Sequence, residues 1–343
     1  MKTQSVLLAS LVAGVLAVTA GTRSDATAID SLTQATEWLN SPPLQAEDLR
    51  GKVVLVDFWT YTCVNWMRTL PYLREWSEKY RDQGLVVIGV HSPEFGFERN
   101  AQHVRRATQA LGVDYPVAID SDHAIWRAYH NQYWPAVYLI DASGRVRFRH
   151  VGEADYGQLE QALRSLLPQA AAGSDDKPAP TSAKGAEVAA DWKNLRSGEN
   201  YLGRERTVNF ASPEGLGRGT PRTYSIPQRL RLNEWSLDGA WTITPEASVL
   251  DRAPGRIAYR FHARDVNLVM GVATLDHPVK FRVRIDGMPP GEARGTDVDA
   301  EGYGSVDEPR LYQLIRQPSP IVERTFEIEF FGEDVAAFSF TFG

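Results

Sequence analysis

One stretch of this chain, VVLVDFWTYTCVNW at residues 53–66, predicts a buried β-strand that leads to a cysteine at the start of a helix. Cys63 is the only cysteine among the 343 residues. In a Cys-x-x-Cys site the second sulfur would stand three positions later, where this chain has Trp66. A dithiol can close an internal disulfide and release its substrate, whereas a lone thiol cannot. The stretch therefore predicts a thiol site with one sulfur in place of two.

The composition is that of an ordinary globular protein, because 43% of the residues are apolar and 23% are charged. A chain of 343 residues is long enough for two domains. The formal net charge of -6 gives no basic surface, so we expect no nucleic acid partner. A single cysteine excludes an intramolecular disulfide and a cysteine-rich metal site. We also expect no cofactor.

The N-terminus has the pattern of a targeting segment. Lys2 supplies a positive charge, residues 6–20 are almost entirely small and apolar, and residues 18–20 suit a signal peptidase. The pattern predicts a signal peptide over residues 1–20, with an uncleaved membrane anchor as the alternative. Both interpretations place the mature protein in the periplasm or another extracytoplasmic space.

Residues 31–168 alternate short apolar runs with amphipathic segments, which predicts an α/β domain with a mixed sheet covered by helices. The predicted strands are 53–58, 85–90, 117–119, 136–140 and 146–151, and the predicted helices are 65–80, 101–111, 122–130 and 158–167.

Residues 169–190 are rich in Ala, Ser, Lys, Asp and Pro and contain no aromatic residue, so they are typical of a flexible linker. From residue 191 to 343 the apolar residues alternate with polar ones, which predicts an all-β domain built as a sandwich or jelly roll. Its clearest strands are 257–261, 279–285, 325–330 and 338–342.

Three features of the first domain point to redox chemistry. Cys63 begins a predicted helix, and a helix N-terminus favours a thiolate. Asp57 is an acid in an apolar strand, and a buried carboxyl can acquire a raised pKa and transfer protons. Trp134-Pro135 stands directly before a strand and is a candidate cis bond.

These features resemble the thioredoxin superfamily, most closely extracytoplasmic proteins of the TlpA and DipZ type. The resemblance covers about residues 35–168 and rests on VDFWTYTC at 56–63, LPYL at 70–73, HSPEF at 91–95 and Pro135. The second domain resembles the C-terminal region of the DipZ family, through RFHARD at 260–265, EPRLY at 308–312 and RTFEIEF at 324–330. That family region implies a carbohydrate-binding-like jelly roll, and with it a possible glycan partner.

The resemblance implies a role for each matching residue. Cys63 would be the attacking thiolate, Asp57 the buried acid, and Pro135 the residue that shapes the substrate groove. The family's resolving cysteine maps to Trp66, so Cys63 would form mixed disulfides with protein or small-molecule thiols, and an external reductant would finish each cycle. The predicted neighbours of the site are Trp59, Thr60, Trp66, Trp134 and Glu94.

Two other functions remain open from the sequence. Thr60 lies three residues before Cys63, as in the Thr-x-x-Cys of peroxiredoxins, which suggests a one-cysteine thiol peroxidase. Alternatively, Cys63 is an inert buried residue and the chain is a non-enzymatic cell-envelope binding protein. In that case aromatic residues such as Trp235, Trp241 and Tyr303 would stack on sugars, unless they belong to the core.

A weak calcium-loop pattern lies in the second domain. It consists of Asp297, Asp299, Glu301 and Glu308, spaced roughly as in an EF-hand. Glu301 departs from the expected Asp or Asn and no helix is predicted on either side, so the alternative is a β turn that carries surface acids.

Overall fold

The computed structural model describes residues 28–168, 183–272 and 277–343. The predicted signal peptide, residues 1–20, lies outside the described residues, as do residues 169–182 of the predicted linker. Within the described ranges, no helix is long and apolar enough to span a membrane.

The first domain, which we call the α/β domain (residues 30–166), contains one mixed sheet. Its strand order is β1-β4-β3-β2-β5-β6, with β2, β3 and β4 parallel and the other neighbours antiparallel. The strands are β1 (Glu37–Leu39), β2 (Val53–Trp59), β3 (Leu85–His91), β4 (Val117–Ile119), β5 (Ala136–Ile140) and β6 (Val146–Val151). The expected thioredoxin-like α/β fold is confirmed.

Helices cover both faces of this sheet. They are α1 (Ala46–Leu49), α2 (Val64–Lys79), α3 (Ala101–Ala110), α4 (Ala124–Ala128) and α5 (Tyr156–Leu166). Because side chains alternate along a strand, Val53, Leu55 and Trp59 of β2 join the core cluster under α2, α3 and α5. Val54 and Val56 join the cluster on the opposite face, with η1 (Asp30–Gln34), α1 and α4. Asp57 alternates in step with Val53, Leu55 and Trp59, so its side chain lies on the same face of the sheet, toward α2.

The second domain, the β domain (residues 200–342), is a curled antiparallel sheet of ten strands. Strand β10 bridges its two halves, since Ser248 and Val249 pair with β16 whereas residues 255–261 pair with β15. The expected all-β architecture is confirmed. The strands are β7 (Asn200–Tyr201), β8 (Arg222–Tyr224), β9 (Trp235–Ile243), β10 (Ser248–Phe261), β11 (Asp265–Val272), β12 (Val279–Ile285), β13 (Tyr303–Val306), β14 (Arg310–Arg316), β15 (Arg324–Phe330) and β16 (Val335–Phe342).

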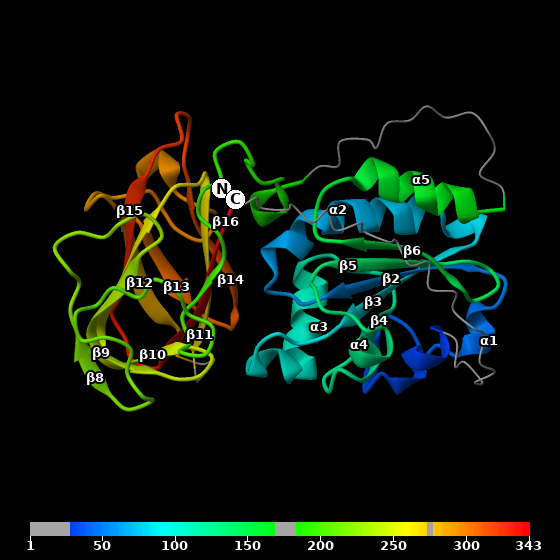
Figure 1. Ribbon diagram of the computed structural model, residues 1–343, viewed down its shortest axis with the longest axis horizontal. Coiled ribbons are helices and arrows are strands. Elements are labelled where there is room, and N and C mark those ends of the chain that lie inside the picture. Colours follow the sequence, from blue (N-terminus) through cyan, green and yellow to red (C-terminus); the bar gives the residue numbers. More distant parts are fainter. Residues whose placement is uncertain (1–27, 169–182, 273–276) are drawn as a thin grey trace, which may run out of the picture.

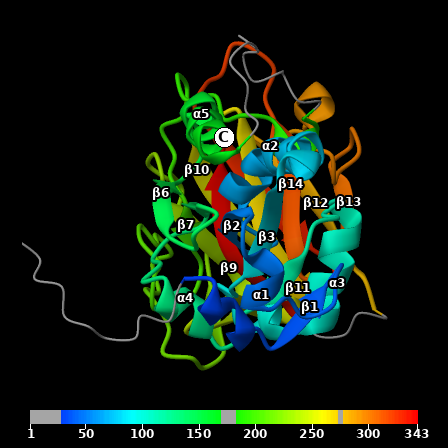
Figure 2. The ribbon, with the colours of Figure 1, turned by 90° about the vertical axis from the view of Figure 1, so that its right-hand side faces the viewer.

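The two domains lie side by side along the long axis of the molecule (Figure 1). When the molecule is turned by 90°, the α/β domain stands in front of the β domain (Figure 2). Their contact is partly aromatic: the ring of Phe338 on β16 lies 5.2 Å from that of Phe95 and 4.7 Å from that of Phe97. Val269 and Leu311 of the β domain belong to the same core cluster as α2. The two domains therefore share an apolar core cluster across their interface.

The C-terminal part of the predicted linker differs from the expectation of a flexible segment. Residues 185–187 form a short 3₁₀ helix, η4 (Gly185–Glu187), and Glu187 forms an ion pair with Arg74 of α2. On the other side, Arg316 of β14 donates a hydrogen bond to the carbonyl of Gly185. These contacts fix the segment to both domains, a tertiary effect that composition does not reveal.

Candidate functional site

Cys63 stands between β2 and α2, as the N-cap residue of the helix. Its N–H donates to the Thr60 carbonyl at 3.2 Å, and its own carbonyl accepts from the Met67 N–H at 3.0 Å. These bonds make a tight turn and start the helix. The only cysteine of the chain is therefore held at the carboxyl end of a central strand and is partly buried.

Both domains line the cavity that contains Cys63, whose volume is about 150 Å³. The α/β domain contributes Arg68 and Glu153, and β16 contributes Phe342. Between η4 and β7, residues 192–199 form a further wall, which we call the cover segment; it supplies Trp192, Leu195, Ser197, Gly198 and Glu199. Cys63 thus shares a small pocket with residues of the β domain.

Burial raises the pKa of the Cys63 thiol well above its ordinary value. Backbone N–H groups of Trp66 and Asn65, at the helix N-terminus, act in the expected direction and lower the pKa. Loss of water around the sulfur outweighs them, and the negative charges of Glu199 and Glu94 raise the pKa further. The thiol is therefore protonated at neutral pH.

Trp66 occupies the place of a second sulfur and points into the core. It is fully buried, and its Nε1–H donates to Oδ2 of Asp57 at 2.7 Å. Its ring stacks on Trp59 with centroids 4.2 Å apart. Burial raises the pKa of Asp57 from 3.8 to about 7, against the hydrogen bond from Trp66, which lowers it. The structure therefore brings together three of the predicted site residues, Asp57, Trp59 and Trp66. Trp66 is hydrogen-bonded to the acid and stacked on Trp59.

A second buried carboxyl, which the sequence analysis missed, supports the loop before Cys63. Glu98 accepts a hydrogen bond from the Thr62 hydroxyl at 2.6 Å and from the N–H groups of Glu94 and Phe95 at 2.7 and 2.9 Å. Burial raises the pKa of Glu98 to about 7. Glu98 thereby links the cysteine loop to the loop that follows β3. Because Phe95, at the N-cap, has no side-chain acceptor, the sequence lacks the S/T-x-x-E signature that would have marked Glu98.

Thr60 and His91 form a buried pair on the same edge of the sheet. Thr60 Oγ1 lies 3.4 Å from His91 Nε2, and both residues are fully buried. Burial lowers the pKa of His91 to about 3, so the imidazole is neutral. The His91 ring packs against those of Tyr61 and Trp59. This pair adds packing around the cysteine loop without adding charge.

Glu94 lies at the domain interface. Its Oε1 accepts hydrogen bonds from the Tyr201 hydroxyl at 2.6 Å and from Arg206 Nη1 at 2.8 Å. Glu199 lies near enough for the two carboxylates to interact, and burial raises its pKa to about 7, with the charge of Glu94 acting in the same direction. The predicted neighbour therefore connects the loop after β3 to the β domain.

Pro135 follows Trp134 through a cis peptide bond, as expected. Ala136 pairs with Phe58 across β5 and β2, so Pro135 falls next to Trp59 in register. The Trp134 indole donates to the Ser92 carbonyl at 3.0 Å. The proline loop and the cysteine loop thus share one edge of the sheet, while the role of Pro135 in substrate binding stays a prediction.

Arg68, a charged residue that lines the thiol cavity, forms buried contacts that the sequence analysis missed. One guanidinium nitrogen lies 2.7 Å from Glu153 Oε1 and another donates to the Phe342 carbonyl at 3.1 Å. The Arg68 and Glu153 side chains are only 2% and 7% exposed. Glu153 and Phe342 lie 85 and 274 positions after Arg68 in the sequence, so no local pattern signals these contacts.

The sugar-stacking hypothesis is wrong for two of its three aromatic residues. Trp235 and Trp241 are fully buried, and their indole N–H groups donate to Val208 and Asp238 carbonyls. They are core residues of the β domain. Tyr303 is 46% exposed, with the Arg282 guanidinium over its ring.

Two acids of the calcium-loop pattern, Asp297 and Asp299, accept hydrogen bonds from the protein. Asp297 accepts from Arg310 at 2.8 Å and from the Gln313 N–H at 2.8 Å, and Asp299 accepts from the Tyr303 N–H at 2.8 Å. Among the described residues, no group of three or more His, Cys, Asp or Glu side chains gathers as a metal site. Asp297, Asp299 and Glu301 lie before β13, whereas Glu308 follows that strand, so calcium binding stays a prediction.

Comparison with known proteins agrees with this architecture. Residues 28–166 match the Redoxin family, and residues 197–343 match the family described as a thioredoxin like C-terminal domain. The chain therefore belongs to the thioredoxin superfamily, as a thiol-disulfide oxidoreductase-like member with a single cysteine. The resemblance to the DipZ family is confirmed as well.

Individual relatives cover different parts of the chain. Protein DipZ of Mycobacterium tuberculosis is 38% identical over 69% of this chain and 34% of its own length, so the chain spans about a third of that relative. Thiol-disulfide oxidoreductase ResA of Bacillus thuringiensis is 30% identical over 38% of this chain and 72% of its own length. A solved thiol-disulfide isomerase from Corynebacterium glutamicum is 28% identical, with a TM-score of 0.37 over 39% of this chain and 93% of its own.

Proposed function

We propose that this protein exchanges disulfides as a monothiol through Cys63, and that its substrates are small thiols and disulfides. The observation that carries the proposal is the small pocket of about 150 Å³ in which the only cysteine of the chain stands at the N-terminus of α2. The membership of the thioredoxin superfamily supplies the class of reaction.

The reaction has two steps that balance in sulfur and electrons. The Cys63 thiol first loses its proton to water, and the thiolate attacks one sulfur of a small disulfide. A bond from Cys63 to that sulfur forms, the substrate's S–S bond breaks, and the other half leaves as a thiolate. An external thiolate then attacks the mixed disulfide at the substrate's sulfur and releases the Cys63 thiolate. Trp66 offers no sulfur to replace that external thiol.

The size of the cavity supports small substrates. The cover segment and Phe342 stand against the thiol, whereas Trp66, below it, is buried and packed against Trp59. A folded protein substrate would have to displace the β domain from Arg68 and from the Phe338 contacts before its disulfide met Cys63. A disulfide of a few heavy atoms needs no such displacement.

The peroxidase alternative has less support. Both reactions need the Cys63 thiolate, so the raised pKa of Cys63 does not separate them. Thr60, whose spacing suggested that reaction, has its hydroxyl beside His91.

We place the protein outside the cytoplasm, on the basis of the signal-peptide pattern at residues 1–20.

The test is to incubate the full chain with excess bis(2-hydroxyethyl) disulfide at pH 9 and to follow the intact mass. We expect one adduct, removed by glutathione, and none on the Cys63→Ser variant. Turnover of this disulfide by glutathione should exceed the uncatalysed rate only with Cys63 present. No adduct on a folded protein, or equal turnover by Cys63→Ser, would refute the proposal. Consumption of hydrogen peroxide that depends on Cys63 would favour the peroxidase instead.

A further inference from the structure

The pocket at Cys63 carries an unequal set of charges. Among the described residues, the charged ones that line it are Arg68, Glu153 and Glu199. Arg68 and Glu153 neutralise each other, because their side chains form a salt bridge at 2.7 Å and are almost fully buried. Glu199 has no such salt bridge within the described chain, so one negative charge remains beside the thiol.

The cation that acts on Glu199 is already engaged elsewhere. Arg206 attracts the Glu199 carboxylate and lowers its pKa. However, Arg206 Nη1 lies 2.8 Å from Glu94 Oε1, and its guanidinium carbon lies 3.6 Å from the centre of the Tyr201 ring. Loss of water, and then the charge of Glu94, prevail and raise the pKa of Glu199 to about 7. A cation that entered the pocket would therefore meet a carboxylate whose charge is incompletely balanced.

The groups that such a ligand would meet are accessible. Cys63 is partly exposed, and Glu199 is exposed. Trp192, the first residue of the cover segment, lines the same pocket and is 59% exposed. The face of an indole attracts ammonium groups. The cover segment thus supplies both a carboxylate and an aromatic ring next to the thiol.

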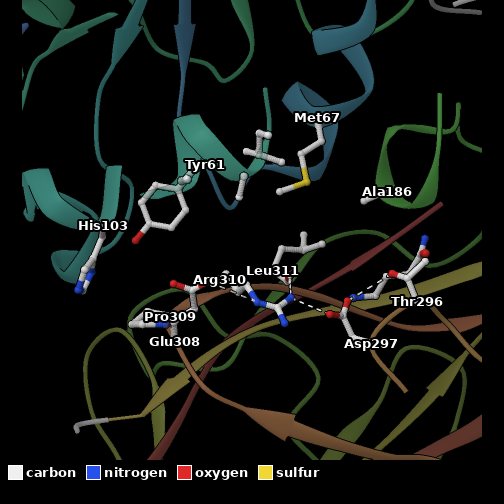
Figure 3. A pocket seen from close by; sticks show the side chains of 14 residues that line it. Tyr61, Met67, His103, Ala186, Thr296, Asp297, Glu308, Pro309, Arg310 and Leu311 are labelled. Atoms are coloured by element: carbon white, nitrogen blue, oxygen red, sulfur yellow. Dashed lines mark hydrogen bonds and ion pairs between the residues drawn. The ribbon is translucent and has the colours of Figure 1, made fainter. Parts of the chain in front are cut away.

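The larger cavity between the two domains, of about 340 Å³, lacks this combination (Figure 3). Asp297 there is bonded to Arg310 at 2.8 Å, and Glu308 lies 3.4 Å from Arg106. Its carboxylates are therefore balanced, and neither a cysteine nor a tryptophan lines it. Of these two interdomain cavities, the one at Cys63 is the one that suits a cation.

We propose that the pocket at Cys63 selects amine-bearing disulfides and thiols, with the Glu199 carboxylate and the Trp192 indole binding the ammonium group. The inference rests on the proposed monothiol exchange and adds its substrate class. The Cys63 thiolate attacks one sulfur of the disulfide, the S–S bond breaks, and the other half leaves as an aminothiolate that takes a proton from water. The ammonium group forms no covalent bond. It holds the disulfide in the pocket and offsets the repulsion between Glu199 and the thiolate.

The test compares two disulfides with the same number of non-hydrogen atoms. Cystamine carries two ammonium groups, and bis(2-hydroxyethyl) disulfide is uncharged. The rate of adduct formation on the full chain is followed by intact mass at pH 8, where Glu199 is ionised. Each rate is divided by the rate of the free thiol N-acetylcysteinamide with the same disulfide, which corrects for intrinsic reactivity. We expect a corrected preference for cystamine of about threefold to fivefold, as for one exposed ion pair, and a smaller one at high salt.

Three variants assign this preference to residues. Glu199→Gln should abolish most of it, and Trp192→Leu should reduce it about twofold, as for one exposed cation–π contact. Glu205→Gln, at an exposed position outside the pocket, should keep the wild-type value. A change in the pKa of Cys63 cancels in the comparison, because both disulfides react with the same thiolate.

The outcomes separate this inference from the reaction on which it rests. Adducts with both disulfides but no preference for cystamine would overturn the selection and leave the monothiol exchange standing. A wild-type preference in Glu199→Gln or in Trp192→Leu would also overturn it. No adduct with either disulfide on the folded chain would refute the exchange, and the selection with it.

Discussion

At the scale of single residues, Trp66 changes the task of Asp57. In a dithiol site a buried acid helps a second cysteine lose its proton, which is the role that the family resemblance implied. Here the acid accepts a hydrogen bond from an indole at 2.7 Å and its second oxygen, Oδ1, has no partner within the described chain. The acid is therefore a packing partner whose charge is unfavourable in its surroundings.

This arrangement makes stability depend on pH. Asp57 has a pKa of about 7 in the folded protein and 3.8 ordinarily, so between these values the folded state holds a proton that the unfolded state has lost. Stability should fall as pH rises from about 4 to about 7, and then level off. Glu98, with its pKa near 7, adds a fall over the same window.

Asp57→Asn keeps an acceptor for Trp66 and removes the titration. We expect a flatter dependence of the free energy of unfolding on pH, with a gain on the order of a few kcal/mol at pH 8 relative to pH 4. Urea unfolding at pH 4 to 8 measures it. The exposed position of Asp82 offers a control, Asp82→Asn, which should leave the slope as it is. A slope equal to wild type in Asp57→Asn would show that the acid is ionised in the fold.

At the scale of elements, two features of the structure shift the pKa of the Cys63 thiol in opposite directions. The N-terminus of α2 lowers the thiol pKa, while the cover segment and the β domain exclude water and bring Glu199 near. Exclusion of water prevails. The sequence analysis considered only the helix, because the cover segment lies more than a hundred residues further along the chain.

Glu199→Gln removes one negative charge near Cys63 and keeps the shape of the cover segment. We expect the pH midpoint of alkylation by iodoacetamide to move down by about half a unit to one unit from its wild-type position, because the thiolate loses a repulsive neighbour. Stopped-flow alkylation between pH 7 and 11 measures the midpoint. Glu205→Gln, at an exposed position of the same region, should not move it. An unmoved midpoint in Glu199→Gln would contradict the charge interaction.

Most strands and helices of the α/β domain were predictable from the sequence. The strands at 53–59, 85–91, 136–140 and 146–151 agree with their predicted ranges to within one residue, since short apolar runs between turns leave few alternatives. The contacts of the site were less predictable. Arg68 with Phe342, and Glu94 with Tyr201, depend on how two domains dock, and hydrophobic periodicity carries no information about docking.

At the scale of the whole molecule, we expect the interface to control which reagents reach the thiol. Phe338 packs against Phe95 and Phe97, away from the residues that line the cavity at Cys63. Its truncation should loosen the docking of the β domain and leave the cavity wall itself intact. Docked domains open transiently, and the opening becomes more frequent as the interface weakens.

Phe338→Ala should therefore accelerate the reaction of Cys63 with a bulky maleimide–polyethylene glycol reagent by tenfold or more, as expected for a loss of at least about 1.4 kcal/mol of interface energy. The reaction with small iodoacetamide should change much less. The ratio of the two rates is the measured quantity. Phe331→Ala removes an exposed ring, 46% accessible and outside the interface, and should keep the wild-type ratio. A wild-type ratio in Phe338→Ala would mean that the interface does not control access.

The packing of Trp66 also constrains the history of the site. A single change of Trp66 to cysteine would leave a void of nearly an indole's size beneath the thiol and a buried carboxyl without its donor. Such a loss typically costs about 3–5 kcal/mol, a large part of the roughly 5–15 kcal/mol that keeps a protein folded. Trp59, stacked on the same ring, would lose its neighbour too. Regaining a second sulfur in one step would therefore cost the fold a large part of its stability, unless other core residues changed with it.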